Sequence, residues 1–500
     1  MKRRSIGLFV LLVISAMHLQ GQALAEGGDK TAGDITMQCG VSVSSNGSDK
    51  TLLTDGKHST AWTADNDSNQ TVELVLPDDL SAAGLYVMWN VVPGQWSLEA
   101  MAEDGDWQEV DLGAGMGFIN CFVTLNDGLA RLRITTGSGW KCSIAEISIF
   151  SKGSLPQEVQ VWQKAPDKAD LMVVSAHPDD EHIYFGGTLP TYAGQRKKHT
   201  VVVYMTSSPI IRKFEALDGL WEVGVREYPV FLPLANKYTS TVDDAELAWD
   251  GLDNTVGLLV EQFRRFMPDV VVTHDLNGEY GHGAHKLTAL AVTKAVLASG
   301  RQEKYPSSAQ QYSAWQVKKC YLHLYGKNTV RMDWQVELPV FGGKTALQMA
   351  QAGYDLHVSQ HFRERPILDS GDYDNSRFGL YYTAVGEDTG KRDFFENIPD
   401  QPKPTAGPAA SPAPTAGPTA VVISLQSSAP DPLSDSVEAA ASVPKGMRIT
   451  KDSDLAIRVF LAFGAVAFLA AVLLAYRKSQ MESRRQPHRR GSRSHGRIMT

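Results

Sequence analysis

The residues best suited to chemistry stand in the segment VSAHPDDEH at positions 174–182, directly after a short apolar run. His177 and Asp180 are three positions apart, so a turn at this point can aim both side chains at one metal ion. Imidazole nitrogen and carboxylate oxygen are both suitable zinc ligands. The segment therefore predicts part of a metal site.

A second segment, NGEYGHGAH at positions 277–285, supplies His282 and His285 in an H-x-x-H pair. A catalytic zinc ion needs a third protein ligand and an open position for water. Each segment alone has a plainer explanation. The segment at 174–182 could be a turn with a solvated acidic face, and the histidine pair at 277–285 could be incidental in a glycine-rich loop. Together they bring five ionisable groups to the ends of two predicted strands, and such a group needs a cation or a function to offset its repulsion and burial.

The elements that must position these residues lie in positions 168–398. The runs LMVVSAH and HTVVVYMTS are continuously apolar, as expected of strands covered on both faces. Residues 255–267 have helical apolar spacing and lead into the strand-like PDVVVTHD. Alternating strands and helices predict a Rossmann-like α/β domain with a mainly parallel sheet. Ligands bind at the carboxyl ends of such strands, where both segments stand.

With AHPDDE intact at 176–181, this domain resembles the PIG-L/LmbE family of zinc-dependent de-N-acetylases. The family's second signature, GHPDH, is matched by GHGAH at 281–285. Further matches are RKFEA at 212–216, HVSQ at 357–360, FGLYYTAVG at 378–386 and RDFFENI at 392–398. The resemblance implies a hydrolase that removes the acetyl group from an N-acetylated amino sugar of the N-acetylglucosamine type, with one Zn²⁺ in the catalytic domain.

The resemblance also implies roles for individual residues. The zinc ligands would be His177, Asp180 and His285. Asp179 matches the general base, and His282 the histidine that stabilises charge on the reacting carbonyl. Tyr280 stands where relatives carry a tyrosine that contacts the substrate or the oxyanion, and Arg212 matches a substrate-binding arginine.

In the implied reaction, zinc lowers the pKa of water towards ~7 and Asp179 takes a proton as the water attacks the acetamide carbonyl. Zinc, a protonated His282 and Tyr280 would hold the oxyanion. Asp179 or His282 would then protonate the departing amine. One departure from the family pattern, Gly283-Ala284 in place of Pro-Asp, leaves the orientation of His282 open.

Positions 27–153 contain short apolar or alternating runs separated by turn residues, which predict a β-sandwich. LLTDGKHSTAWTA at 52–64 and the closing CSIAEISIF resemble the discoidin-type, galactose-binding-like sandwiches. That resemblance implies glycan binding, with a structural Ca²⁺ in some members. A spacer without a ligand is the other interpretation.

Both ends of the chain carry membrane signals. Residues 1–25 have the basic start, apolar run and small residues of a signal peptide, with an uncleaved anchor as the alternative. A Pro/Ala/Thr-rich linker at 399–454 leads to an apolar stretch at 455–476 that approaches the ~20 residues of a membrane span. The basic tail at 477–500 predicts a single-pass protein with an extracellular ectodomain and a cytoplasmic C-terminus.

The net charge of −8 is uneven, because the tail holds eight Lys and Arg and one Glu, leaving about −15 for the rest. An acidic body argues against nucleic acid as a partner. The four cysteines allow three complete pairings, and their positions favour a disulfide between Cys39 and Cys142.

Two functions from different classes remain open on the sequence. The first is a surface-anchored zinc deacetylase acting on an acetylated amino sugar or glycan. The second is a catalytically inactive, glycan-binding surface protein with a deacetylase-like domain. Retention of every ligand position and of Asp179 favours the enzyme.

Overall fold

The computed structural model describes residues 30–399, apart from 102–104, 111–116, 126–128, 207 and 362–365. The predicted signal peptide, membrane span and basic tail lie outside the described residues, as does the linker beyond its first position. Among the helices that the structure describes, none is both long enough and apolar enough to cross a bilayer.

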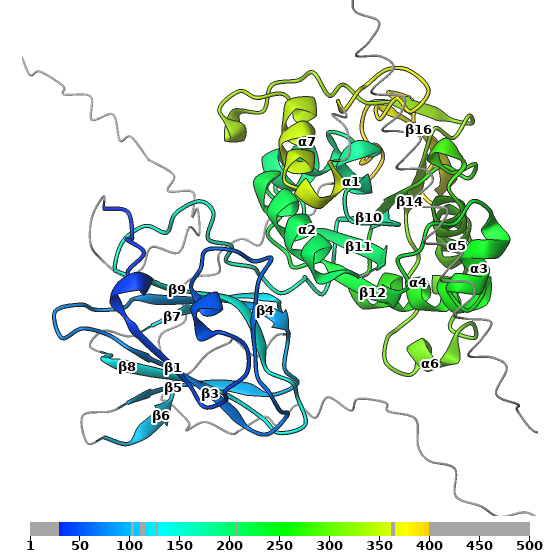
Figure 1. Ribbon diagram of the computed structural model, residues 1–500. Coiled ribbons are helices and arrows are strands. Elements are labelled where there is room, and N and C mark those ends of the chain that lie inside the picture. Colours follow the sequence, from blue (N-terminus) through cyan, green and yellow to red (C-terminus); the bar gives the residue numbers. More distant parts are fainter. Residues whose placement is uncertain are drawn as a thin grey trace, which may run out of the picture. The chain divides into compact units, whose positions relative to one another are not determined.

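The first nine strands form two antiparallel sheets (Figure 1). One has the order β1 (Gly40–Val43), β3 (Gln70–Val75), β8 (Arg131–Thr136), β5 (Trp96–Met101) and β6 (Trp107–Glu109). The other has the order β2 (Trp62–Thr63), β9 (Ser143–Phe150), β4 (Gly84–Val91) and β7 (Asn120–Thr124). Short 3₁₀ turns, η1 (Thr36–Gln38) and η2 (Lys50–Leu53), accompany them.

The two sheets share one apolar core. Alternate residues of β3 and β8 point inward, including Val72, Leu74 and Ile134, and they pack with Val87 of β4 and Ile147 of β9. This inside–outside alternation is the period-2 pattern that predicted a sandwich. The N-terminal region is therefore β-rich as expected, and the discoidin-like assignment stays a prediction.

The predicted disulfide between Cys39 and Cys142 is wrong, because all four cysteines are free thiols. The Cys39 thiol donates to the backbone carbonyl of Ile35, 3.4 Å away, while Cys142 is buried just before β9. The two cysteines stand near opposite ends of the domain in the sequence, and those positions did not lead to a bond between them. The calcium expectation is also unsupported, since all groups of three ligand side chains found among the described residues lie in the second domain.

The second domain is built on a seven-stranded sheet with the order β12 (Val230–Leu234), β11 (Thr200–Thr206), β10 (Leu171–Ser175), β13 (Val270–Thr273), β14 (Lys319–His323), β16 (Arg377–Thr383) and β15 (Thr329–Arg331). The first five strands pair in parallel, and the last two are antiparallel. The order 3-2-1-4-5 of the parallel strands is that of a doubly wound α/β sheet. The predicted α/β region with a mainly parallel sheet is confirmed.

Helices cover both faces of this sheet (Figure 1). One set is α1 (Asp180–Ile183), α2 (Ile210–Glu222) and α7 (Ala346–Asp355); the other is α3 (Val242–Ala248), α4 (Leu252–Phe266) and α5 (Gly283–Ser299). Smaller turns are η3 (Pro190–Gln195), η4 (Glu279–Gly281), α6 (Pro306–Ala309), η5 (Pro339–Phe341) and η6 (Val358–Gln360). Along β10, Leu171 and Val173 pack in the core with α2, while Met172 and Val174 pack with α4 and α5.

The strand order reverses between β10 and β13, which are neighbours in the sheet. A doubly wound sheet binds its ligand at this switch point, beyond the carboxyl ends of the strands. The segment 176–182 leaves β10 at that edge, and the segment 274–285 leaves β13 there. The fold therefore brings the two predicted motifs to one place.

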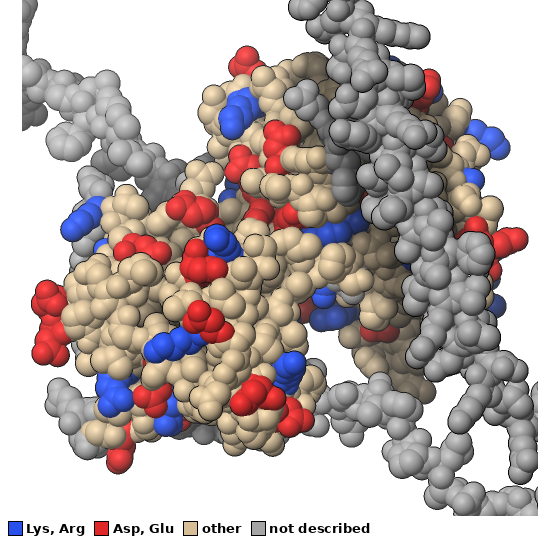
Figure 2. Space-filling model, in the orientation of Figure 1, with Lys and Arg blue, Asp and Glu red and all other residues tan. Residues whose placement is uncertain are grey.

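Charged side chains of both signs lie interspersed on the face of the described residues seen in Figure 2. That face offers no continuous basic surface of the kind that binds a phosphate backbone.

Candidate metal centre

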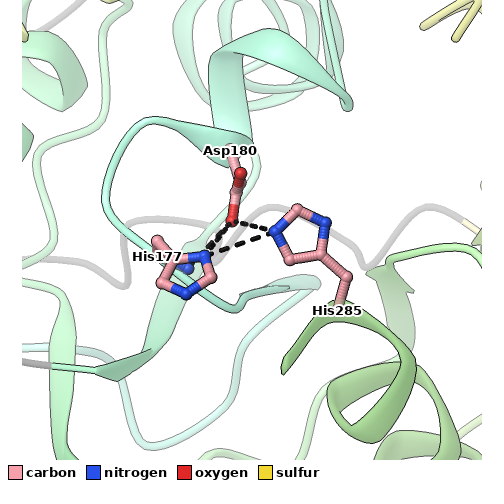
Figure 3. A group of neighbouring side chains, drawn as sticks. All are labelled: His177, Asp180 and His285. Atoms are coloured by element: carbon pink, nitrogen blue, oxygen red, sulfur yellow. Dashed lines mark hydrogen bonds and ion pairs between the residues drawn. The ribbon is translucent and has the colours of Figure 1, made fainter. Parts of the chain in front are cut away.

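Three side chains from the two motifs converge at the switch point (Figure 3). The Oδ2 atom of Asp180 lies 3.0 Å from His177 Nδ1 and 3.2 Å from His285 Nε2, and the two ring nitrogens are 3.3 Å apart. Bonds of ~2.0–2.1 Å to one tetrahedral ion would place ligand atoms about 3.3 Å apart. The predicted ligands His177, Asp180 and His285, named here the metal centre, therefore fit a zinc ion in both chemistry and spacing.

The electrostatics of the metal centre also fit a cation. Burial raises the pKa of Asp180, but His285 and His177 outweigh it and hold that pKa well below its usual range. Burial lowers the pKa of His285, but Asp180 and Glu279 outweigh it and raise that pKa to about 10. A cation bound between these groups would take the place of a proton on His285.

Glu279 organises the far side of the metal centre, and the sequence reasoning missed it. Its Oε2 accepts from Nδ1 of His285 and Nδ1 of His274, both at 2.8 Å, and its Oε1 accepts from Nδ1 of His323 at 2.7 Å. Binding Nδ1 of His285 turns Nε2 of the same ring towards Asp180. Such an orienting carboxylate is a usual partner of a metal-binding histidine. The available signal was an acid inside the NGEYGHGAH segment itself.

His274, which directly follows β13, connects the two loops that form the metal centre. Its Nε2 accepts from the backbone N–H of Ala176 at 2.9 Å, and its Nδ1 faces Glu279. Both ring nitrogens are therefore engaged, which ties the loop after β10 to the loop after β13.

The predicted general base, Asp179, lies beside the ligands. Its Oδ1 accepts from Arg212 Nη2 at 2.9 Å, and its backbone N–H donates to Glu181 Oε2 at 2.9 Å. Burial and then Asp180 raise the pKa of Asp179 to about 7, against the opposing effect of Arg212. Its carboxyl group can therefore exchange a proton near neutral pH.

The backbone at Asp179 is strained. Its φ of +116° is unfavourable for a residue with a side chain and costs ~1–3 kcal/mol. The contacts from Arg212 and Glu181 hold the residue in this conformation. Arg212 is itself buried, so the structure shows it as the partner of the base, while its predicted contact with substrate stays a prediction.

His282 begins α5, where its Nδ1 accepts from the backbone N–H of Ala284 at 3.2 Å. That bond makes Nε2 the protonated nitrogen of the neutral ring. Burial, and then His285 and His177, lower the pKa of His282 to about 3. Two neighbouring imidazoles thus disfavour a further positive charge on His282, and its protonation during the reaction stays a prediction. A neutral ring can still donate from Nε2.

The Gly283-Ala284 departure has a structural reason. A Cβ at Gly283 would lie 2.0 Å from the carbonyl oxygen of Thr241, and the Gly283 N–H donates to the Thr239 carbonyl at 2.8 Å. A proline here would clash and remove that bond. The segment 239–241 therefore requires glycine, and His282 remains positioned by its bond to Ala284.

Tyr280 is the most exposed of the predicted site residues, with 49% of its surface accessible. Its ring centroid lies 5.5 Å from those of both His282 and His285. The structure thus places Tyr280 at the solvent side of the metal centre, where a substrate would enter. All seven predicted site residues are brought together.

Comparison with known proteins agrees with this arrangement. Residues 172–296 match the family described as PIG-L: GlcNAc-PI de-N-acetylase, and that stretch contains every predicted site residue. An N,N'-diacetylchitobiose deacetylase structure from Pyrococcus horikoshii covers 38% of this chain and 71% of its own at 16% identity, with a TM-score of 0.29, which is too low to support an argument.

Two curated relatives are 1D-myo-inositol 2-acetamido-2-deoxy-alpha-D-glucopyranoside deacetylases. The protein from Rhodococcus erythropolis is 29% identical over 171 residues, covering 29% of this chain and 58% of the relative. The protein from Mycolicibacterium smegmatis is 30% identical over 178 residues, covering 30% of this chain and 58% of the relative. The chain thus spans less than two thirds of the length of these relatives. Within that limit, the stretch that carries the metal centre is similar to the PIG-L deacetylases.

Proposed function

We propose that this protein is a zinc-dependent hydrolase that removes the acetyl group from an N-acetylated amino sugar. One observation carries the proposal: His177, Asp180 and His285 present their ligand atoms within 3.0–3.3 Å of one another, with Asp179 directly beside them. Two imidazoles and a carboxylate with an accessible neighbouring position are the ligand set of a hydrolytic zinc site.

When bound, zinc would supply Lewis acidity for the acetamide carbonyl and lower the pKa of water. Asp179 takes the proton from the attacking water. Arg212 donates to Oδ1 of that carboxylate, and Oδ2 is the proposed proton acceptor. With a pKa raised to about 7, Asp179 can later return the proton to the departing amine.

Stabilisation of the oxyanion falls to His282 and Tyr280. The bond from Ala284 to Nδ1 of His282 leaves an Nε2–H to donate towards the reacting carbonyl. The Tyr280 hydroxyl is the second proposed donor. Hydrogen bonds aimed at the developing negative charge, rather than full protonation of His282, are the proposed source of stabilisation.

The proposed substrate carries a 2-acetamido-2-deoxyglucose unit. This choice is supported by the names of the curated relatives, which act on such a unit attached to myo-inositol. The rest of the substrate is left to experiment.

An acetate-release assay tests the activity. The purified, zinc-loaded full-length chain is incubated with N-acetylglucosamine, its myo-inositol conjugate and N-acetylglucosamine oligomers, and acetate and free amine are measured. Equal release of both products is expected from at least one substrate. A matched control is His199→Ala, which removes a histidine whose side chain is 63% exposed and contacts Glu227. A fully zinc-loaded chain that releases neither product from any substrate would favour the inactive glycan-binding alternative.

We also propose that the enzyme acts at the cell surface, with residues 26 to about 454 outside and 477–500 inside. The support is the sequence of the two ends alone. Protease treatment of intact cells should degrade the ectodomain and spare the tail. A protected ectodomain with a cleaved tail would reverse the orientation.

A further inference from the structure

A second group of histidine and carboxylate side chains lies behind the metal centre. It consists of Glu181 and His182 of α1 and His357, which precedes η6, and is named here the inner cluster. All three residues are completely buried. The proposed deacetylase mechanism uses none of them directly. Burial of three ionisable side chains in one place therefore needs another explanation.

The geometry of the inner cluster resembles that of a metal site. Nε2 of His182 and Nε2 of His357 each lie 3.5 Å from the same oxygen, Oε1 of Glu181. The two rings meet nearly edge to face, with centroids 5.5 Å apart. These separations are close to the ~3.3 Å between neighbouring ligands of one tetrahedral zinc ion and longer than a good hydrogen bond.

The two histidines lack other partners. Apart from Glu181, no group among the described residues forms a hydrogen bond with a ring nitrogen of His182 or of His357. Buried polar atoms are nearly always paired, so two imidazole rings whose Nε2 atoms face one carboxylate at 3.5 Å need an explanation. An ion between the rings would take up one nitrogen of each.

The backbone of α2 packs closely against these nitrogens. A Cβ at Gly219 would lie 2.7 Å from Nε2 of His182 and 3.1 Å from Nε2 of His357. Any side chain at position 219 would therefore collide with the two rings. Glycine lets α2 approach both ligand atoms and so helps to enclose the inner cluster.

Glu181 is held in place from two sides. Its Oε1 accepts from the Tyr204 hydroxyl at 2.6 Å, and its Oε2 accepts from the backbone N–H of Asp179 at 2.9 Å. A metal-binding carboxylate is commonly oriented by such hydrogen bonds. The inner cluster thus has both converging ligand atoms and support for one of them.

We propose that Glu181, His182 and His357 bind a second divalent ion of the zinc type, distinct from the ion of the metal centre. All three ligands are closed to solvent, so no substrate can reach an ion there, and the proposed role is structural. It links α1 to the segment after α7 and, through Glu181, supports the backbone of Asp179. This inference does not depend on the proposed deacetylase activity.

Metal stoichiometry tests the proposal. The full-length chain is loaded with excess Zn²⁺, freed of loose metal by gel filtration and measured by mass spectrometry of the metal. Two ions per chain are expected for the wild type and for His199→Ala, the surface control. His357→Ala and His285→Ala should each retain one, and the double variant none.

The location of the ions provides a test that does not require a variant to fold. Crystals of the wild type loaded with Zn²⁺ should show two anomalous peaks, one of them between Glu181, His182 and His357. A single peak at the metal centre, with a water molecule or no density in the inner cluster, would overturn the proposal. So would a second peak at any other position.

Discussion

The metal centre and the inner cluster each take one of two consecutive residues of α1, yet they differ in access and in hydrogen bonding. Asp180 points to the metal centre and Glu181 to the inner cluster. The metal centre borders the half-exposed Tyr280, and its His285 is oriented by Glu279. The inner cluster is closed to solvent, and its histidines have no hydrogen-bond partner apart from Glu181 among the described residues.

This difference suits the metal centre to catalysis and the inner cluster to a structural role. A catalytic ion needs an open position and ligands oriented from outside, whereas a structural ion is enclosed by its ligands. Asp179 stands between the two: its side chain faces Arg212 and the metal centre, while its N–H binds the carboxylate of the inner cluster. Variants that affect one cluster and spare the other are the strongest tests of this division.

The largest effect is expected from His285→Ala. Loss of this imidazole leaves two ligands in the metal centre, too few for a catalytic zinc site, so tight zinc binding there and activity should both disappear. The inner cluster should keep its ion. Zinc content and acetate release measure the two effects. Unchanged zinc binding and normal activity would refute the ligand assignment.

Next in size is the effect of Asp179→Asn. As the proposed base, Asp179 is not one of the proposed ligands, so zinc content should remain near normal while kcat falls on the order of 10²–10⁴-fold. The matched substitution of the adjacent acid, Asp180→Asn, should lose zinc from the metal centre and recover part of its activity when metal is added. If Asp179→Asn lost the ion and Asp180→Asn kept it, the two roles would be exchanged.

Glu279→Gln should have a more moderate effect. The amide retains an oxygen but loses the charge that orients His285, and removal of such a partner weakens metal binding about 10–100-fold. Competition with a chelator gives the zinc affinity, and circular dichroism checks that the chain is folded. Zinc binding at full affinity would show that Glu279 supports the fold without tuning the metal centre.

The smallest effect on catalysis is expected from Gly219→Ala, which targets the inner cluster alone. The new Cβ would meet His182 Nε2 at 2.7 Å and the Gly353 carbonyl oxygen at 2.9 Å. Overpacking of this kind should lower the free energy of unfolding by ~1–3 kcal/mol. Gly326→Ala is the matched control, since a Cβ there has no neighbour within 4 Å. Urea unfolding compares the two, and equal stabilities would mean that the space beside His182 is not restrictive.

The α/β region and the two motifs at its strand ends could be predicted from the residues alone. Continuous apolar runs mark strands buried on both faces, and the carboxyl ends of parallel strands share one edge of the sheet. His177 and Asp180 could be predicted as partners because their spacing is local. The membrane signals at the two ends are equally local, and they remain predictions because they lie outside the described residues.

Contacts between groups far apart in the chain could not be predicted in this way. Glu279 joins three histidines from separate segments, and Arg212 of α2 contacts Asp179. No local pattern shows that His357 packs against Glu181, or that Cys39 and Cys142 remain unpaired. The resting charge of His282 likewise depends on burial and on two neighbouring imidazoles. Motifs specify ligands within a few residues of one another, whereas hydrogen-bond partners, burial and pKa arise from packing between elements far apart in the chain.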